Sequence, residues 1–397
     1  MEFLKNLIVN VGLWFQGLLA STSLPETWVL AITRAAGALA LALVPLVTIF
    51  FFIWYERKIV ARIGSRLGPN NSGAYGGPWG IFQVFADAIK MFTKEDVIPA
   101  GADRWVFNVA PMLTLAIAVM IWAVLPLGKG LIGIDLNIGI FYLLSLGSGS
   151  IVAVVMAGWG SNNKYALLAA FRSIATLISY EIPKALSVLV VVMLAGSLSM
   201  QDIVAAQDVA FLLALPLTAF LFLAATLSEL GRRPFDLVEA DSEIVAGYFV
   251  EYSGIKFGMF YVAQFMNQLA AAAIFSTLFL GGWRGPWVDQ VPVLSTLWLT
   301  AKILLSVLII QFFQYTLPRL RIDQVLAFNW KFLTPLALVN VCAVALAGKT
   351  VPASAGPLTQ AGISLGANVV LTLIVLGILA IAGRQARQRE ASRLATQ

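Results

Sequence analysis

Residues 229–256 read ELGRRPFDLVEADSEIVAGYFVEYSGIK, a densely charged stretch between two long apolar runs. The stretch holds Arg232, Arg233 and six of the chain's 20 acidic residues: Glu229, Asp236, Glu239, Asp241, Glu243 and Glu251. The whole chain of 397 residues is 60% hydrophobic and 12% charged, whereas a soluble domain carries about 25% charged residues. This composition predicts a polytopic membrane protein, and charge so concentrated in it predicts a polar site.

Composition also limits the chemistry. The chain has no histidine and one cysteine, Cys342, which lies in an apolar run and is expected to be a small buried residue. An iron–sulfur cluster needs about four thiolates, and haem or structural zinc needs His, Met or Cys ligands. We therefore expect the chain to bind no redox cofactor of its own, so redox chemistry would use a mobile substrate or a partner's cofactor. The net charge of +6 does not indicate nucleic-acid binding, because the basic residues lie between apolar runs and set topology.

Hydropathy predicts an all-α fold in a single membrane domain, residues 1–397. A helix needs about 20 apolar residues to cross the hydrocarbon. By that measure nine spans are predicted, the fourth of them short. They lie near residues 29–55, 105–127, 138–158, 185–200, 209–229, 257–281, 294–316, 332–348 and 362–383. Residues 1–20 are interrupted by polar side chains and are expected to form an interfacial segment rather than a cleaved signal.

The distribution of basic residues predicts the orientation. Five segments between or after the spans hold 20 of the 26 Lys and Arg residues. They are residues 56–104, 159–184, 230–256 and 317–331, and the tail after residue 383. The positive-inside rule places these segments in the cytoplasm, with the N-terminus outside and the C-terminus inside.

Two segments of the cytoplasmic loops are expected to be helical without spanning. In WGIFQVFADAIKMFTKED, residues 79–96, apolar and polar side chains occupy neighbouring helical stripes. Phe82, Phe85, Ile89 and Phe92 form the apolar stripe, and Gln83, Asp87, Lys90 and Lys94 form the polar one. The pattern predicts an amphipathic helix in the membrane surface, with a short soluble core helix as the alternative. Residues 164–184, which include Arg172 and Glu181, are also predicted helical but too polar to span comfortably.

The cytoplasmic end of the first span carries Glu56, Arg57 and Lys58. Basic residues at such a position ordinarily snorkel to the lipid headgroups, and Lys58 fits that interpretation. An acid gains nothing from anionic lipid, so Glu56 requires another explanation. With Arg57, Arg62 and Arg66 nearby, it predicts an enclosed polar site.

The acids of the central stretch predict a proton-handling site. On a helix Glu239 and Glu243 share one face, while Asp241 points away from it. Carboxylates paired in a low-dielectric place raise at least one pKa toward neutrality, which allows proton uptake and release. A solvated acidic loop is the alternative, but the apolar residues interleaved with the acids favour burial.

Some polar residues lie inside the spans. Lys302 is a functional candidate, because an ionisable group at depth costs several kcal/mol unless it is paired or hydrated; an interhelical anchor is the alternative. The amides are expected to be packing contacts: Gln264, Asn267, Gln268, Gln311 and Gln314. From the residues alone, the chain is a membrane protein with a cytoplasm-facing acid and arginine chamber. Proton-coupled transport and the handling of an amphiphilic redox carrier both fit.

Three runs resemble the NuoH family, the membrane subunit of respiratory complex I that joins its redox arm to its membrane arm. They are ERKIVARIGSRLGPN with FADAIKMFTKED, WGSNNKYALLAAFRSIATLISYEIP, and SELGRRPFDLVEADSEIVAGYFVEYSG. LFLGGW at 278–283 and YTLPRLRIDQVLAFNWKFLTP at 315–335 agree with them. The resemblance covers residues 29–348, an eight-span core, and leaves 349–397 as an extra transmembrane helix with a basic tail.

The resemblance implies roles for individual residues. A quinone-binding set would comprise Glu56, Arg57, Arg66, Asp87, Arg232, Glu239, Asp241 and Glu243. A proton path would run through Glu181, Glu229 and Glu251, with Arg172 supporting it. Lys302 is added to the proton path because it is an ionisable residue deep in a predicted span. No catalytic site would be complete in this chain, and quinone would be its substrate.

The implied function is that of a subunit of a proton-translocating NADH or ferredoxin:quinone oxidoreductase in the bacterial inner membrane. Its partners would be the peripheral-arm quinone-module subunits, which with their neighbours carry iron–sulfur clusters and flavin, and small and antiporter-like membrane subunits. A homologous coupling subunit of a membrane-bound hydrogenase is the alternative, to be separated by activity with hydrogen or quinone. A solitary proton-coupled transporter would show two similar halves, which we do not find, and a scaffold would not need buried acids.

Overall fold

The computed structural model describes residues 12–14, 16–18, 21, 25–70, 78–237, 244, 246–350 and 356–395. Within these residues all regular elements are helical, and eight helical segments are long and apolar enough to cross a membrane. The long helices are α3 (Glu26–Ile63), α5 (Arg104–Ile121), α6 (Gly139–Gly160), α7 (Lys164–Ala195), α12 (Gly254–Phe279), α13 (Val293–Thr316), α15 (Thr334–Thr350) and α16 (Pro357–Ala395). The seventh segment, Ile322–Thr350, joins α15 to α14 (Ile322–Phe328) and the π-helix η4 (Asn329–Leu333). The fold is therefore an all-α polytopic membrane protein, as predicted.

Shorter helices complete the described chain. They are η2 (Pro78–Gly80), α4 (Gln83–Thr93), α8 (Met200–Ala205), α9 (Phe211–Ala214), α10 (Pro216–Glu229) and η3 (Gly247–Phe249). The predicted fifth span, 209–229, is divided between α9 and α10, because Leu215 leaves the helical conformation and Pro216 starts a new helix. With α9 and α10 counted as one crossing, the elements follow the nine predicted spans in order.

The prediction for α7 was wrong at its start. The fourth span was expected at 185–200, after a helix too polar to cross. Instead one helix of 32 residues, about 48 Å long at 1.5 Å per residue, includes both segments. Its charges are tolerated because they are paired inside the bundle: Glu181 accepts a hydrogen bond from Ser148, and Lys184 forms an ion pair with Glu229.

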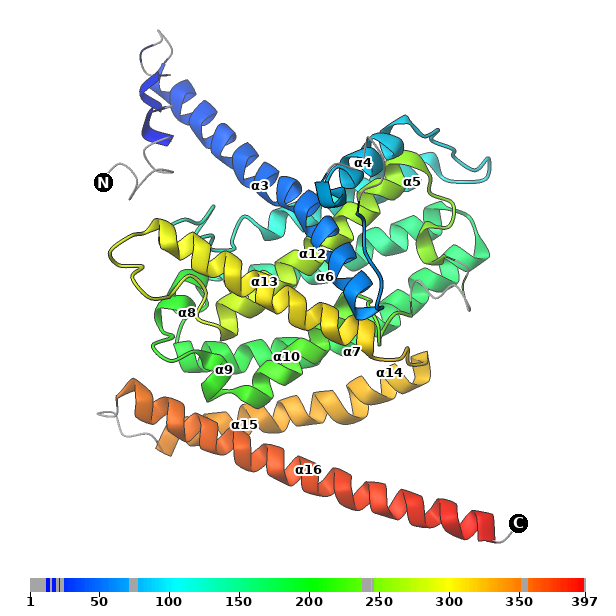
Figure 1. The fold of residues 1–397 in the computed structure, drawn as a ribbon, viewed down its shortest axis with the longest axis vertical. Helices are drawn as coiled ribbons and strands as arrows, with labels where there is room; N and C mark the ends of the chain where they lie inside the picture. The colour runs from blue at the N-terminus through cyan, green and yellow to red at the C-terminus, as the bar shows by residue number, and fades with distance from the viewer. Residues whose placement is uncertain are drawn as a thin grey trace.

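The centre of the bundle is α12, which packs against α5, α13, α3 and α4 (Figure 1). Its sequence allows this because it is apolar all round and rich in alanine, so neighbouring helices approach it from every side. At one edge α15 and α16 lie together, with Leu371 of α16 packed among residues of α10 and α15. Cys342 lies exposed on α15, not buried as expected. It belongs to a helix whose outer face has no neighbour in the described chain and suits hydrocarbon.

Small residues bring α6 close to both of its neighbours. A Cβ added at Gly158 would lie 2.6 Å from the Cβ of Ala170 and 2.7 Å from the carbonyl oxygen of Ala166, both on α7. One added at Gly160 would lie 2.9 Å from the backbone nitrogen of Phe107 on α5. Close backbone approach at small residues is how membrane helices gain packing energy without a hydrophobic driving force. These contacts fix α6 against the helices that carry the polar site.

The predicted amphipathic helix is present as α4. It is held to α3 by an ion pair between Asp87 and Arg57 and by stacking of Phe85 on Phe50, whose ring centroids are 5.0 Å apart. The apolar stripe faces outward, with Ile89 and Phe92 exposed. Its outward apolar face argues against a soluble core helix and agrees with the predicted place in a membrane surface.

Candidate functional site

A cavity of about 550 Å³ lies where the end of α3 and the following residues 64–70 meet α4, α12 and α13. Its lining includes Glu56, Arg57, Arg66, Gln83 and Tyr315. The structure thus brings together residues from segments far apart in the sequence. Glu56 lines this cavity together with Arg57 and Arg66, whereas Arg62 is not among the lining residues.

Glu56 is the buried acid of this cavity, with 5% of its surface exposed. Its Oε1 accepts a hydrogen bond of 2.6 Å from the Tyr315 hydroxyl, which reaches it from α13. Its Oε2 is buried without a hydrogen-bond partner among the described residues. A buried acid with one free acceptor is able to bind a donor that enters the cavity.

Two cations flank the opening of the same cavity. Arg57 pairs with Asp87 across 2.7 Å, and each side chain is about one-third exposed. Arg66 lines the cavity from the turn after α3. At this exposure the ion pair contributes about 0–1 kcal/mol to stability, so its main effect is to position α4 at the opening.

Arg232 lies behind the cavity wall. Its guanidinium is 5.4 Å from the ring centroid of Phe265, a lining residue, and it interacts electrostatically with Tyr315. Its Nε and Nη2 atoms are buried with no hydrogen-bond partner in the part of the chain that the structure describes. Buried donors on a permanent cation favour binding of an electron-rich or anionic group nearby.

Glu239, Asp241 and Glu243 lie outside the described residues. The chain just before them is anchored. Asp236 forms an ion pair with Arg319, and the backbone nitrogen of Leu320 donates to the carbonyl oxygen of Pro234. The acidic segment therefore begins at a point fixed to the turn after α13.

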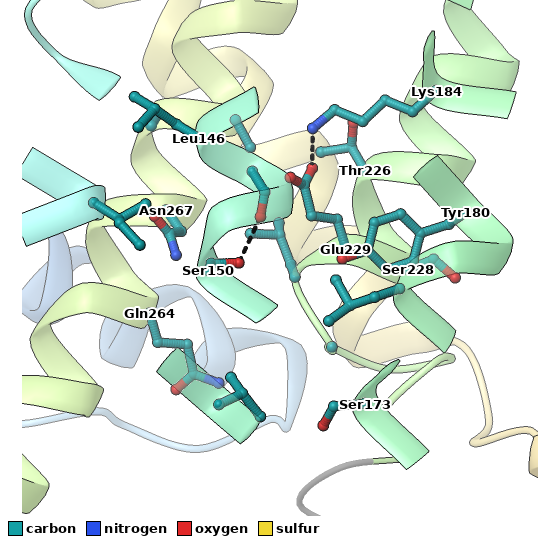
Figure 2. A pocket seen from close by; sticks show the side chains of 18 of the residues that line it. Leu146, Ser150, Ser173, Tyr180, Lys184, Thr226, Ser228, Glu229, Gln264 and Asn267 are labelled. Atoms are coloured by element: carbon teal, nitrogen blue, oxygen red, sulfur yellow. Dashed lines mark hydrogen bonds and ion pairs between the residues drawn. The ribbon is translucent and has the colours of Figure 1, made fainter. Parts of the chain in front are cut away.

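A second cavity, of about 140 Å³, lies among α5, α6, α7, α10 and α12 (Figure 2). Glu229, the last residue of α10, faces it and forms an ion pair with Lys184 of α7, with 2.5 Å between Oε2 and Nζ. In Figure 2, Gln264 and Asn267 approach from α12 on the side opposite Tyr180 and Lys184. Polar and apolar side chains both line the cavity.

Glu181 of α7 lies next to this cavity, where α7 contacts α6. It accepts a hydrogen bond from Ser148 of α6, the residue after Gly147. A Cβ at Gly147 would lie only 3.0 Å from Oε1 of Glu229, so the glycine leaves room for that carboxylate. Glu181 and Glu229 therefore meet neighbouring residues of α6, and Tyr180 interacts electrostatically with both.

Glu251 is placed at the start of α7, where its Oε1 accepts a 2.6 Å hydrogen bond from Asn163. Close to it, the hydroxyl of Tyr252 donates to the carbonyl oxygen of Phe107. Burial raises the pKa of this hydroxyl above its usual range, so Tyr252 stays neutral and keeps its donor. Arg172 lies between Asn163 and Glu181 along α7 and also has an interaction partner.

Lys302 lines neither of the two cavities. Its ammonium donates to the carbonyl oxygens of Gly282 and Arg284, at 3.0 and 2.6 Å, in the turn after α12. Arg284 in turn pairs with Asp208, between α8 and α9. This geometry favours the interhelical anchor for Lys302 over a place in the proton path.

Sequence reasoning missed several residues that the structure places in the cavities, and three of them have large polar side chains close to the predicted acids. Tyr315 and Tyr261 line the larger one, and Lys184 lines the smaller one. A signal existed for Lys184, which follows Glu181 by three residues and so lies one helical turn away. Tyr315 ends an apolar span, where a tyrosine is ordinarily an interfacial anchor. No group of three or more His, Cys, Asp or Glu side chains in the described residues is arranged to hold a metal ion.

Comparison with known proteins agrees with the motifs. A profile of the NADH dehydrogenase family matches residues 36–345. The chain belongs to this family. It is similar to the H subunit of NADH-quinone oxidoreductase from Dehalococcoides mccartyi strain CBDB1, 51% identical over 75% of this chain and 81% of that one. The corresponding protein of Carboxydothermus hydrogenoformans is 45% identical over 73% and 82%, and that of Rhodospirillum centenum 42% over 77% and 91%. The predicted resemblance to the NuoH family is confirmed.

Proposed function

We propose that this chain is the quinone-binding membrane subunit of a proton-translocating NADH or ferredoxin:quinone oxidoreductase. The observation that carries the proposal is the cavity of about 550 Å³, where Glu56 and Tyr315 are hydrogen-bonded beside Arg57 and Arg66. A quinone needs a pocket with apolar walls and a few polar groups that fix its carbonyls. The cavity offers both, since Phe265 and Ile53 line it together with these polar side chains.

The polar residues have distinct proposed roles. Tyr315 orients Glu56, whose free Oε2 accepts from a hydroxyl of the reduced quinone, while Arg232 donates to a quinone carbonyl and stabilises negative charge that develops on it. Arg57, Arg66 and Asp87 shape the opening. Glu239, Asp241 and Glu243 contribute acids beneath the head, as the family resemblance implies.

The second cavity is the proposed start of a proton path. Buried hydroxyls of Tyr180, Thr226 and Ser228 there have no partner among the described residues. A polar cavity of this size holds several water molecules, each satisfied by two to four polar groups. Glu229 and Glu181 are the proposed carriers, supported by Glu251 at the start of α7 and by Arg172 farther along that helix.

Charge on the quinone would drive the transfer. At an effective dielectric constant of about 20, a unit charge 4 Å from a carboxylate is worth about 4 kcal/mol, or about three pKa units. Electrons arrive from the iron–sulfur clusters of peripheral-arm partner subunits, and antiporter-like membrane subunits receive the proton signal. The basic segments face the cytoplasm, with the N-terminus outside.

The decisive test is Glu56→Gln in the assembled complex. Losing a charged acceptor for the quinol hydroxyl costs about 1.5–3 kcal/mol, so the KM for a short-chain quinol in the reverse reaction should rise about 10-fold to 100-fold. Glu26→Gln is the matched control, because it makes the same change at the exposed far end of α3. An unchanged KM, with normal inhibitor sensitivity, would remove Glu56 from the quinone site.

Glu243→Gln tests the acidic segment. If this segment links quinone reduction to the proton path, the variant should lower both quinone reduction and proton pumping. Both activities are measured in inverted membrane vesicles with NADH or reduced ferredoxin as donor. Normal rates of both would contradict the assignment.

A further inference from the structure

Lys184 is a buried cation that the proposed path does not yet use. It is 7% exposed, and its ammonium lies 2.5 Å from Oε2 of Glu229. Among the residues that line this cavity, Lys184 and Glu229 are the two that carry formal charge. A lysine at membrane depth is costly without a partner, so the pair must be considered as one unit.

The residues that line the cavity supply no other cation that could pair with Glu229. On α7 the titratable neighbours are Tyr180 and Glu181, and from η3 Tyr248 lines the cavity. The other helices contribute neutral groups: Thr114 from α5, Ser150 from α6, Thr226 and Ser228 from α10, Gln264 and Asn267 from α12. Among the described residues that line the cavity, Lys184 is therefore the one cation beside Glu229.

We propose that Lys184 is a positioning residue that holds Glu229 as a carboxylate ready to accept a proton in the cavity. This inference rests on the proposed function. It assigns to one lysine the task of keeping the first carrier ionised between transfers.

The proton balance is simple. Water in the cavity delivers a proton to the carboxylate of Glu229, which becomes neutral and releases the ammonium of Lys184. Glu229 then gives that proton up toward Glu181, beside Ser148, and its carboxylate pairs with Lys184 again. Lysine keeps its own proton throughout, so one proton enters and one leaves.

The test uses Lys184→Met in the assembled complex. Without the ammonium, Glu229 should hold its proton to higher pH and so be blocked as an acceptor. An opposite charge at this distance is worth about one to three pH units, so the pH profile of proton pumping should shift that far toward alkaline. Pumping should fall on the acidic side of the profile and recover as the pH is raised.

Companion variants separate charge from structure. Lys184→Gln keeps a hydrogen-bond donor but no charge and should show the same alkaline shift, which covers failure of the Met variant to assemble. Lys184→Arg keeps the charge and should pump within about twofold of wild type with no shift. Lys349→Met, at the exposed end of α15, should change nothing.

The outcomes distinguish the two proposals. If Glu229→Gln pumps normally, the proposed proton path fails whatever Lys184 does. If Glu229→Gln is defective but the Met and Gln variants at 184 keep the wild-type pH profile per assembled complex, the positioning role is overturned and the path stands. In the double variant Lys184→Met/Glu229→Gln, pumping should match Glu229→Gln at every pH.

Discussion

At the scale of single residues, the buried charges differ in whether they are fully paired. Lys184 and Glu229 neutralise each other, whereas Glu56 has one satisfied oxygen and Arg232 two unsatisfied nitrogens. A buried group without a partner costs about 1–3 kcal/mol, more if charged, so folding alone would not favour it. These two groups lie at the larger cavity, where a bound carbonyl would accept from Arg232 and the hydroxyl of a reduced quinone would donate to Glu56.

Tyr315→Phe tests whether the hydrogen-bonded Glu56 takes part in binding at the larger cavity. It removes the donor to Glu56 and leaves the carboxylate with no partner among the described residues, so we expect the KM for quinol in the reverse reaction to rise about threefold to tenfold. Tyr165→Phe, on the exposed surface of α7, is the matched control and should have no effect. A lower turnover number with an unchanged KM would instead make the hydroxyl a proton donor in the reaction.

Lys302→Met separates an anchor from a carrier. The ammonium donates to two carbonyls in the turn after α12. Its loss should therefore lower the free energy of unfolding of the purified complex by about 1–3 kcal/mol, seen as a lower melting temperature. The number of protons pumped per quinone reduced should stay unchanged. Loss of pumping in a complex of normal stability would restore Lys302 to the proton path.

At the scale of elements, the contact between α6 and α7 depends on one glycine. Gly158→Ala would place a Cβ within 2.7 Å of α7 backbone and side chain, and overpacking of this kind costs about 1–3 kcal/mol. Gly149→Ala is a control on the same helix, because its new Cβ would meet Ile117 at an ordinary 3.7 Å. We expect less assembled complex for the first and wild-type amounts for the second, measured by native gel.

The sequence predicted a helix correctly where a single local pattern identified it. The apolar runs located the membrane helices, and the two side-chain stripes located α4. The prediction went wrong at α7, because a hydropathy window counts Arg172, Glu181 and Lys184 as exposed charge and cannot see that each has a partner. The first cavity was predicted in outline from Glu56, but Tyr315 joins it across 259 positions of sequence, a contact that no local pattern encodes.

At the scale of the whole molecule, α12 is the wall between the two cavities. Tyr261 and Phe265 face the larger one, whereas Phe260, Gln264 and Asn267 face the smaller one. A helix is about 10 Å across, and a charge at that distance is worth about 1.7 kcal/mol at an effective dielectric constant of 20. Coupling through α12 is thus strong enough to bias a proton equilibrium by about one pKa unit.

The topology of the whole chain gives the last prediction. Eight spans together with α9 and α10 make an odd number of crossings, so the termini should lie on opposite sides. The chain has a single cysteine, exposed on α15, so Cys342→Ser should be tolerated and provide a cysteine-free background. In it, Gln290→Cys, between α12 and α13, and Arg384→Cys, near the end of α16, are both exposed. The excess of basic residues predicts that a membrane-impermeant maleimide labels position 290 in intact spheroplasts and position 384 in inverted vesicles. The reverse pattern would invert the orientation, and labelling of both from one side would mean that one of α13, α15 and α16 does not cross.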